Sequence, residues 1–563
     1  MTAKLKNSFS RFDIFAALCF LAALAFLLWK APYGFSQADE NFYLSTPYRL
    51  VLGDALLAHE WNSSQLFSFL SYPSLKFLIY INGSSSGIFL SFRYFFVAAQ
   101  LLCAVYLYIS LRHVQTVGAL IGALLMLLYA PLHIMSLSYN TICLLLLPAA
   151  CVTMLRFHKA RASAFISGLL FAGAVICCPY LVALYLLYTL LCIIAPLKKH
   201  LEYSAFSPSY WLLFTVACAV LAAIFLAFIL SRASLQDCVA ALPKIFTDSE
   251  SLNSTFFFQL FKYAESIYGN FWFNSYSLSW PILALVLALD KNRLKHRVWY
   301  LIPAMLITAG YFAYYIFEDR TVNYLMFPMN ILGFFACFLC KKRDMRPFVL
   351  IYVPGIIYSL CIHFASNLAL MSIASAMTVS GIASAIYICT LAKELIAEDK
   401  RMLPRIVGLG LLLAMLMQLS VLVWFRSRYT MWDGDTSELT VTLSEGPQKG
   451  IITTQEKADR YYRLIEDTAA MRQAPAQTVL YLYTDTWLYL MDDAQMGCFS
   501  SWVSHLYPKE DMARLESYWQ LYPEKVPDII FCGDKGDKLA LLTDILPGDW
   551  TQEETDSGVI LRH

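Results

Sequence analysis

Two adjacent carboxylates, Asp39 and Glu40, open a short step that continues through Asn41, Phe42 and Tyr43. A carboxylate beside a hydroxyl group can take its proton as a general base, and two carboxylates together can also bind a divalent ion. Most acidic pairs in loops, however, are solvated surface residues. The chemistry of this pair therefore depends on the elements that hold it in place.

The composition predicts a polytopic α-helical membrane protein. Of the 563 residues, 59% are hydrophobic and only 15% are charged, with a mean hydropathy of +0.56, whereas roughly a quarter of the residues of a soluble protein are charged. The net charge of +2 gives no sign of a nucleic-acid partner. About thirteen apolar segments are long enough, or nearly so, to cross a bilayer as helices. They are residues 14–30, 88–110, 116–133, 141–155, 162–178, 180–196, 209–230, 276–290, 298–317, 322–340, 347–364, 368–391 and 405–425.

Lysine and arginine gather in every second connection between these segments, and the intervening short loops are nearly free of them. The positive-inside rule then predicts a multi-pass protein with its N-terminal tail, 1–13, in the cytoplasm. We expect its membrane to be the plasma membrane. It predicts a membrane domain over 14–428 and an extracytoplasmic C-terminal domain over 429–563. Arg320 is the exception, because it falls in a short loop on the outer side.

Two long loops lie on the outer side in this topology. The first, 31–87, contains an amphipathic stretch, 45–59, and a second apolar stretch, 65–81, which Pro73 interrupts. We expect helices that lie in the plane of the membrane interface or pack against the bundle. The second loop, 232–275, is rich in aromatic residues, which favours an interfacial aromatic belt over a lipid-facing lid.

The C-terminal domain has the composition of a small soluble α/β unit. Its predicted strands are 440–443, 478–483 and 528–532, and its predicted helices are 454–471, with Thr454 as N-cap, and 508–521. This order predicts a small, partly parallel sheet. Cys498 and Cys532 could form a disulfide there, although free thiols explain two isolated cysteines equally well.

The arrangement resembles the integral-membrane glycosyltransferases of the C-type fold. It is most similar to the branch that contains the protein O-mannosyltransferases and the lipid A aminoarabinose transferase. The residues that carry the resemblance are Asp39-Glu40-Asn41-Phe42-Tyr43, Ser138-Tyr139-Asn140-Thr141, and Arg320, Tyr324 and Pro328. The likeness covers the membrane part, and in the C-terminal domain it is only architectural.

The resemblance implies an enzyme that moves a sugar from a polyprenyl-phosphate donor to an acceptor at the outer face of the membrane. The acceptor would be a protein, a lipid or a glycan, and membrane lipid would surround the site. Asp39 and Glu40 would be the catalytic pair. The substrate pocket would include Tyr43, Tyr139, Asn140 and Tyr324.

Transfer of a sugar from such a donor needs only one carboxylate, as a general base. A phosphate ester leaves as a stable anion, so the enzyme needs a base for the acceptor hydroxyl and cations for the phosphate rather than a strong acid. Asp39 fits the base, and attack opposite to the phosphate would invert the anomeric centre. Glu40 could orient Asp39, contact the acceptor or bind a divalent ion, and a solvated neighbour is an equal alternative.

Arginine is the expected phosphate ligand, because its planar group can bind two oxygens at once. Arg320 is the first candidate, since its place against the positive-inside pattern needs a reason; the alternative is a pair with Glu318 or Asp319. Arg49 is the second candidate, with a headgroup contact as the alternative. His59 is a further, weaker candidate for the pocket.

No spacing of cysteine or histidine predicts a metal site, and a possible divalent ion is the only cofactor to consider. Two other functions fit a membrane protein of this size. A transporter or flippase of lipid-linked sugars would carry polar residues within its spans and two matching halves, and both signs are weak here. A non-catalytic scaffold that displays the C-terminal domain would bind no donor.

Overall fold

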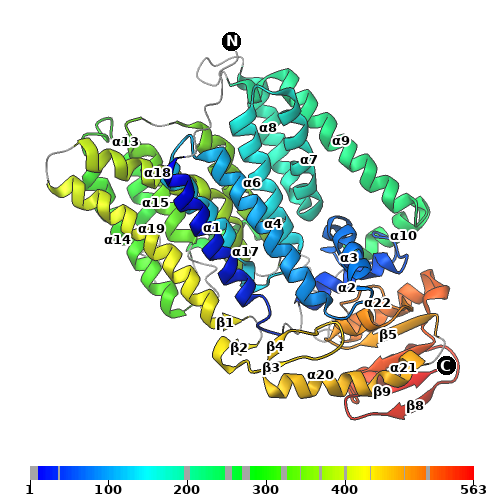
Figure 1. Ribbon diagram of the computed structural model, residues 1–563. Coiled ribbons are helices and arrows are strands. Elements are labelled where there is room, and N and C mark those ends of the chain that lie inside the picture. Colours follow the sequence, from blue (N-terminus) through cyan, green and yellow to red (C-terminus); the bar gives the residue numbers. More distant parts are fainter. Residues whose placement is uncertain are drawn as a thin grey trace.

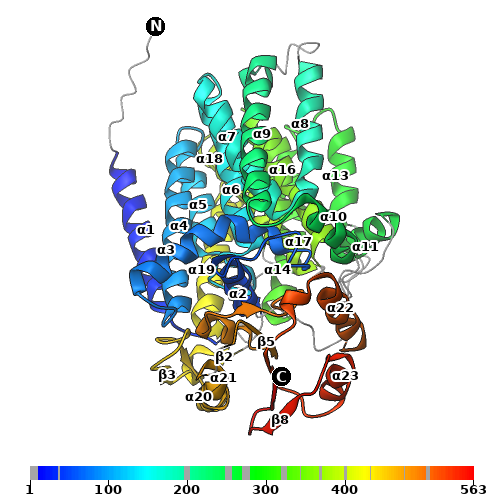
Figure 2. The same cartoon turned by 90° about the vertical axis from the view of Figure 1, so that its right-hand side faces the viewer.

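The computed structural model describes residues 10–35, 39–195, 203–246, 256–268, 279–318, 326–342, 344–366, 370–398, 402–430, 433–473, 476–502 and 508–563. A large helical bundle forms one part of the molecule, and a smaller module with a β-sheet closes one end of it (Figures 1 and 2). Helix α1 runs along the bundle and ends beside this module. The predicted fold class, a polytopic helical bundle followed by a small α/β domain, is confirmed.

Each predicted apolar segment coincides with a helix in the described part of the chain. The helices are α1 (Arg11–Lys30), α4 (Ile88–Leu111), α5 (Thr116–Leu128), α6 (Tyr139–Phe157), α7 (Arg161–Cys177), α8 (Val182–Ile194), α9 (Pro208–Leu230), α13 (Ser279–Leu289), α14 (Arg297–Glu318), α15 (Met326–Leu339), α16 (Val353–Ala365) after a π-helical turn (Phe348–Tyr352), α17 (Leu370–Ala376), α18 (Thr378–Glu398) and α19 (Met402–Arg428). Among the described residues, seven helices or helix pairs are long and apolar enough to cross a membrane, and five shorter apolar helices accompany them. The chain is a multi-pass membrane protein, and the number of thirteen spans stays a prediction.

Helix α18 forms the centre of the bundle, because small residues let its neighbours approach closely. A Cβ atom added at Gly333 of α15 would lie 2.2 Å from the hydroxyl oxygen of Ser384 in α18. A Cβ at Gly118 of α5 would meet the α18 backbone at 2.7 Å. Inside lipid the hydrophobic effect does not drive helices together, so close van der Waals packing of this kind stabilises their association. These contacts hold α5 and α15 directly against α18.

The first outer loop forms two helices, α2 (Asp39–Val51) and α3 (Ser68–Asn82). The predicted helix over 45–59 is therefore wrong at both ends. It begins at Asp39, where two carboxylates stabilise the positive end of the helix dipole, and it is over by Gly53, whose φ of +103° is not helical. Pro73 does not interrupt α3, which continues through it. Every residue of α2 from Glu40 to Leu50 is buried, so α2 packs inside the protein rather than at the membrane interface.

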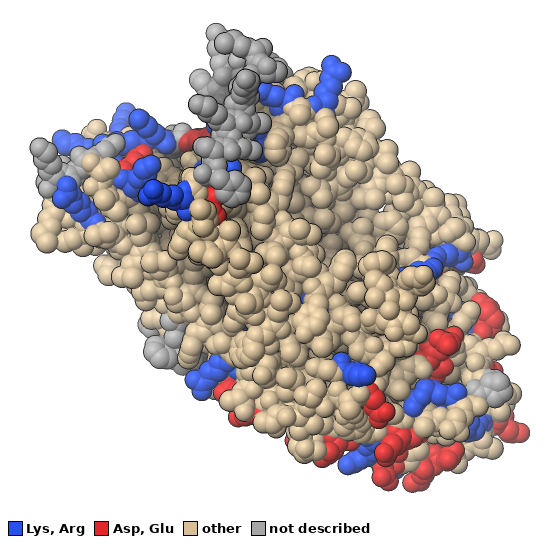
Figure 3. All heavy atoms as spheres, viewed as in Figure 1, with Lys and Arg blue, Asp and Glu red and all other residues tan. Residues whose placement is uncertain are grey.

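The second outer loop contains α10 (Leu235–Ile245) and α11 (Phe256–Tyr268). Both helices expose large apolar side chains. In α10 these are Leu235, Val239 and Leu242, and in α11 Phe257, Phe258 and Phe261. Such faces suit the predicted interfacial belt, which stays a prediction. Charged side chains gather towards the two ends of the face drawn in Figure 3, and a broad uncharged zone separates them, as a membrane requires.

The C-terminal module contains the predicted, partly parallel sheet. Its strands β5 (Thr478–Leu482), β6 (Gln495–Met496), β7 (Ile529–Cys532), β8 (Thr551–Glu554) and β9 (Val559–Arg562) lie in the order β6-β5-β7-β9-β8. Strand β5 runs parallel to β6 and β7, whereas β9 is antiparallel to β7 and β8. Helices α20 (Gln455–Asp467), α21 (Ala469–Gln473), α22 (Pro508–Leu521) and α23 (Asp537–Ile545) accompany the sheet.

Several details of this module follow the sequence. Thr454 caps α20 by accepting a hydrogen bond from the backbone N–H of Lys457. The predicted strand 440–443 is present only as β3 (Val441–Thr442), which pairs with β4 (Ile452–Thr453) outside the main sheet. A second short hairpin pairs β1 (Tyr429–Thr430) with β2 (Gly434–Asp435). Cys498 and Cys532 are both free thiols, so the alternative of a disulfide between them is wrong.

Candidate active site at the start of helix α2

Asp39 is the first residue of α2, and its side chain is only partly buried. Tyr43 lies one helical turn further along, on the same face of α2. Its ring meets the ring of Tyr139, the first residue of α6, with 6.3 Å between the ring centroids. The pKa of Tyr43 is raised well above its usual value by burial and, next, by the negative charge of Asp39. The structure thus brings together three residues that the sequence analysis selected.

Helix α6 begins with a capping box that fixes where Tyr139 lies. The Ser138 hydroxyl accepts a hydrogen bond from the backbone N–H of Thr141, and the Thr141 hydroxyl accepts one from the backbone N–H of Ser138. Asn140 follows Tyr139 and is buried. The recurrent motif that carries the family resemblance therefore forms a rigid helix start beside Asp39.

Glu40 is 1% exposed and binds Arg93 of α4 through both carboxylate oxygens. Arg93 Nε lies 2.7 Å from Oε1 of Glu40, and Arg93 Nη2 lies 2.5 Å from Oε2. The same guanidinium donates hydrogen bonds to the carbonyl oxygens of Ala31 and Gly34 at 2.7 Å. The alternative of a solvated Glu40 is therefore wrong, and the pair joins α2 to the bundle and to the segment after α1.

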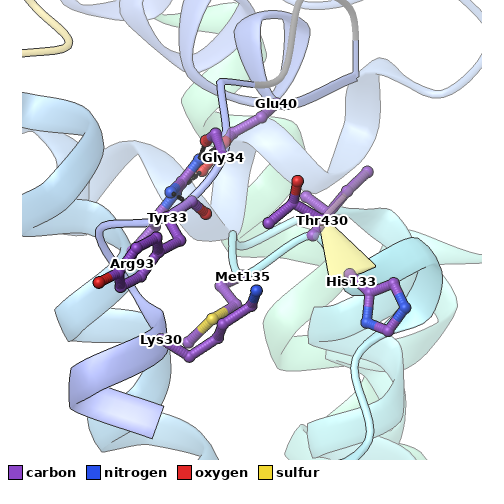
Figure 4. A pocket seen from close by; sticks show the side chains of 9 residues that line it. Lys30, Tyr33, Gly34, Glu40, Arg93, His133, Met135 and Thr430 are labelled. Carbon is purple, nitrogen blue, oxygen red and sulfur yellow. Dashed lines mark hydrogen bonds and ion pairs between the residues drawn. The ribbon is translucent and has the colours of Figure 1, made fainter. Parts of the chain in front are cut away.

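A small cavity of about 20 Å³ lies next to this ion pair (Figure 4). Its lining consists of Lys30, Tyr33, Gly34, Glu40, Arg93, His133, Ile134, Met135 and Thr430. Lys30 and Arg93 are the basic residues of this lining, and Glu40 is its acidic residue. A volume of this size accepts about one water molecule or one small polar group.

Two buried cations stand close to the cavity. Lys30 is 3% exposed, and its Nζ donates to the Thr436 hydroxyl at 2.5 Å. Arg426, in the last turn of α19, is 1% exposed and donates through Nη1 to the carbonyl oxygen of Leu128 at 2.6 Å. Within the described residues its Nε has no hydrogen-bond partner. A buried cation in this state is suited to an anion.

Arg49 lies near the other end of α2, about 15 Å along the helix from Asp39 at 1.5 Å per residue. It is fully buried and paired with Asp54 at 2.6 Å and Glu60 at 3.3 Å. It also donates to the Tyr518 hydroxyl at 2.9 Å. The prediction that Arg49 binds the donor phosphate therefore loses its basis, because protein groups occupy the whole guanidinium.

His59 belongs to the same region and lies away from Asp39. Its Nδ1 accepts a hydrogen bond from the backbone N–H of Ala55 at 3.1 Å, and its ring packs against Tyr522. Burial lowers the pKa of His59 to about 4. Burial also raises the pKa of the neighbouring Glu60. We therefore remove His59 from the candidate pocket.

Arg320 and Tyr324 lie outside the described residues. Pro328 is buried in α15. Arg93, Lys30 and Arg426 are the residues that the sequence analysis did not select for the site. A signal for Arg93 was available, because a charged residue inside an apolar segment calls for a partner or a function. Among the described residues, no three His, Cys, Asp or Glu side chains come together as a metal site.

Solved structures similar to this chain include those of an oligosaccharyltransferase and of ArnT. An Archaeoglobus fulgidus oligosaccharyltransferase, tethered with an acceptor peptide that contains the NVT sequon, is 11% identical with a TM-score of 0.48, over 92% of this chain and 69% of that one. ArnT from Cupriavidus metallidurans, bound to undecaprenyl phosphate, is 12% identical with a TM-score of 0.49, over 98% of this chain and 97% of that one. Archaeoglobus fulgidus AglB, in complex with an inhibitory peptide and a dolichol-phosphate, is 11% identical with a TM-score of 0.45, over 98% of this chain and 74% of that one. No family model and no curated protein matches the sequence.

These neighbours match the C-type fold that the sequence resembles. Their identities of 11–12% and TM-scores below 0.5 mean that the likeness carries no argument about the activity of this chain.

Proposed function

We propose that this protein is an inverting glycosyltransferase that moves a sugar from a polyprenyl-phosphate donor to an acceptor at the outer face of the membrane. The observation that carries the proposal is the setting of Asp39. It is a partly exposed carboxylate at the start of a helix that is buried from Glu40 to Leu50, and it lies beside two tyrosine rings. The next residue, Glu40, lines a cavity together with the buried Lys30 and Arg93.

The proposed reaction needs one proton transfer and one substitution. Asp39 takes the proton from the acceptor hydroxyl while the acceptor oxygen attacks the anomeric carbon of the sugar. The bond from that carbon to the phosphate oxygen breaks, and its electron pair leaves with the polyprenyl phosphate. Attack from the opposite side inverts the anomeric centre. Tyr43 and Tyr139 present flat rings beside Asp39, on which a sugar could pack.

Cations near the cavity would stabilise the departing phosphate. Lys30 and Arg426 are buried and not paired with a carboxylate among the described residues, whereas Arg93 is occupied by Glu40. We therefore propose Lys30 and Arg426 as phosphate ligands, together with Arg320 on the strength of its sequence alone. Glu40 has the role of holding the start of α2 through Arg93.

The proposal requires the site to face the outside of the cell. The alternation of basic loops supports a cytoplasmic tail at 1–13, a membrane domain over 14–428 and an extracytoplasmic module over 429–563. Helix α2, which begins with Asp39, lies beside the C-terminal module in Figures 1 and 2, so the two are on the same side of the bundle.

Mass spectrometry of cell-envelope glycans tests this function. Cells that produce the wild type are compared with cells that lack the protein and with cells that produce Asp39→Asn. Asp544→Asn, an exposed carboxylate on α23, is the matched control. We expect one glycan modification to disappear without the protein and with Asp39→Asn, and to persist with Asp544→Asn. The same set of glycan modifications in all four strains would overturn the proposal.

A further inference from the structure

Helix α2 lies between the bundle and the C-terminal module, and side chains of the module hold it along its length. The Ser45 hydroxyl donates to Ser501 Oγ at 3.0 Å and lies 3.1 Å from the Thr486 hydroxyl. Thr46 lies 3.2 Å from the same Ser501 hydroxyl. The Tyr48 hydroxyl donates to the carbonyl oxygen of Asp492 at 2.9 Å. These contacts all join residues more than 400 positions apart in the sequence.

A buried group of four charged residues, Arg49, Asp54, Glu60 and Lys525, also joins this region to the module, and we call it the Arg49 cluster. None of the four is more than 3% exposed. Lys525 Nζ lies 2.5 Å from Asp54 Oδ1, and Arg49 joins Asp54 to Glu60. Two positive and two negative charges balance, which a buried group of this kind requires.

Arg49 also reaches into the module itself. Its Nη2 donates to the carbonyl oxygen of Cys498 at 2.5 Å and to the Tyr518 hydroxyl at 2.9 Å. Although burial acts to raise the pKa of Asp54, Arg49 and Lys525 hold that pKa below its usual range. The first loop and the module are thus joined through the Asp54–Lys525 ion pair and the hydrogen bonds of Arg49.

The segment just before α2 is held by the module as well. The backbone N–H of Gly34 donates to the carbonyl oxygen of Ile452 at 2.9 Å, and the N–H of Ile452 donates to Pro32 at 2.7 Å. The N–H of Phe35 donates to the Asp433 carboxylate at 2.6 Å. The module therefore contacts the chain on both sides of Asp39.

We propose that the C-terminal module is a positioning element of the active site, in which the Arg49 cluster fixes the tilt and depth of α2 and thereby the place of Asp39. Arg49 is a positioning residue in this account and touches no substrate. The role assigned to Asp39 rests on the proposed function, whereas the mechanical role of the cluster does not.

The physical reason lies in the tight packing of α2. Helix α2 has 13 residues with Pro47 among them, and its residues from Glu40 to Leu50 are all buried. A shift at Arg49 is therefore carried through tightly packed side chains to Asp39, about 15 Å away. A misplacement of about 1 Å at a reacting group lowers the rate by about a hundredfold. Four buried charges have few alternative arrangements, because each displacement leaves a charge without its partner.

Hydrogen–deuterium exchange of the full chain in lipid nanodiscs tests the proposal. The amides of residues 43–46 report the first turns of α2, and none of them belongs to the Arg49 cluster. In Arg49→Gln we expect their exchange to be about tenfold faster than in the wild type. Faster exchange confined to residues 49–60, with the amides of 43–46 within about twofold of the wild type, would overturn the proposal.

Arg112→Gln is the control for loss of a partly buried ion pair elsewhere in the molecule. Arg112 pairs with Asp13 at the start of α1, and α1 is 20 residues long, so this pair lies about 30 Å from the module end of the bundle. Exchange at 43–46 should be unchanged in this variant. A rise equal to that of Arg49→Gln would also overturn the proposal, because it would show a general loss of stability.

Ser501→Ala keeps the proposal testable if Arg49→Gln does not fold. It removes only the hydroxyl that contacts Ser45 and Thr46. We expect about threefold faster exchange at 43–46 and faster labelling of Asp39 by a carbodiimide with glycine ethyl ester. Unchanged exchange and labelling would overturn the proposal.

Neither readout uses a sugar donor. The exchange and labelling results therefore decide the positioning role even where the transferase proposal fails. The glycan profile of Asp39→Asn decides the transferase proposal whatever the exchange shows.

Discussion

At the scale of single residues, Asp39 and Glu40 have different surroundings although they are neighbours in the chain. Glu40 is buried and fully engaged by Arg93, whereas Asp39 keeps part of its side chain exposed beside Tyr43. Burying a bidentate ion pair at a helix start has an unfavourable desolvation free energy, because both charged groups lose their water. This arrangement is consistent with a need to fix the carboxylate that comes one residue earlier.

A double-mutant cycle on Glu40 and Arg93 tests this division. Removing one partner leaves a buried charge without compensation, so Arg93→Met should lower the free energy of unfolding by about 3–5 kcal/mol. The combination Glu40→Gln with Arg93→Met should recover most of that loss. Arg93→Lys should remain less stable than the wild type, because one ammonium group cannot replace the guanidinium contacts to Glu40, Ala31 and Gly34. Additive losses in the cycle would contradict the pairing.

The stability of the folded protein depends on pH through His59. Burial lowers its pKa from 6.5 to about 4, so between these values the unfolded chain binds a proton that the folded protein does not. The stabilisation is present above pH 6.5 and is lost as the pH falls towards 4. A shift of this size corresponds to about 3 kcal/mol. The mechanism is the loss of the hydrogen bond that Nδ1 accepts from the backbone N–H of Ala55.

Thermal unfolding as a function of pH measures this effect. His59→Gln should be less sensitive to pH between 6.5 and 4 than the wild type. The charged and titratable groups around His59 are Arg49, Asp54, Asp237, Tyr522, Glu524 and Lys525. They are shared by both proteins, as is the opposing effect of Glu60, so the difference between the two curves isolates His59. Parallel curves would contradict the assignment.

At the scale of elements, the sequence was informative where structure depends on local pattern. Apolar segments predicted the helices, and Thr454 predicted the start of α20, because periodicity and capping are local properties. The predicted bounds of α2, 45–59, are wrong. Its apolar face is buried against the module and does not lie at the membrane interface. The contacts of Arg49 with Tyr518, 469 positions away, leave no trace in residue spacing.

The packing of α15 on α18 offers a prediction at this scale. Gly333→Ala should lower the stability by about 1–3 kcal/mol, because its new Cβ would lie 2.2 Å from the Ser384 hydroxyl oxygen. Gly381→Ala on α18 is the matched control, since its Cβ would meet only Met326 Sδ at 3.5 Å and Met329 Sδ at 3.8 Å. Detergent-resistance or unfolding measurements compare the two. Equal losses in both variants would contradict the close packing.

At the scale of the whole molecule, α2 lies between the bundle and the module and is bonded to both. The loop that carries Asp39 is joined to the bundle by Arg93 and to the module by the Arg49 cluster. The candidate site itself was only partly predictable. Asp39, Tyr43 and Tyr139 were selected from motifs, whereas Lys30 and Arg426 come together through contacts between distant elements.

The membrane orientation is testable with a thiol reagent that does not cross membranes. Asp544→Cys places a thiol on the exposed surface of α23, and Lys295→Cys places one in the basic connection between α13 and α14. In intact cells we expect labelling at position 544 and none at 295. The unsubstituted protein serves as the background for its native cysteines. The opposite pattern would place the module in the cytoplasm.

The rate of sugar transfer by purified Asp39→Asn tests the central claim most directly. Wild type, Asp39→Asn and Asp544→Asn are reconstituted in proteoliposomes and given a panel of polyprenyl-phosphate sugars. For the donor that the wild type uses, we expect Asp39→Asn to be slower by about 10²–10⁴-fold, as for loss of a general base, and Asp544→Asn to match the wild type. Transfer by Asp39→Asn at the wild-type rate would contradict the role of Asp39 as the base.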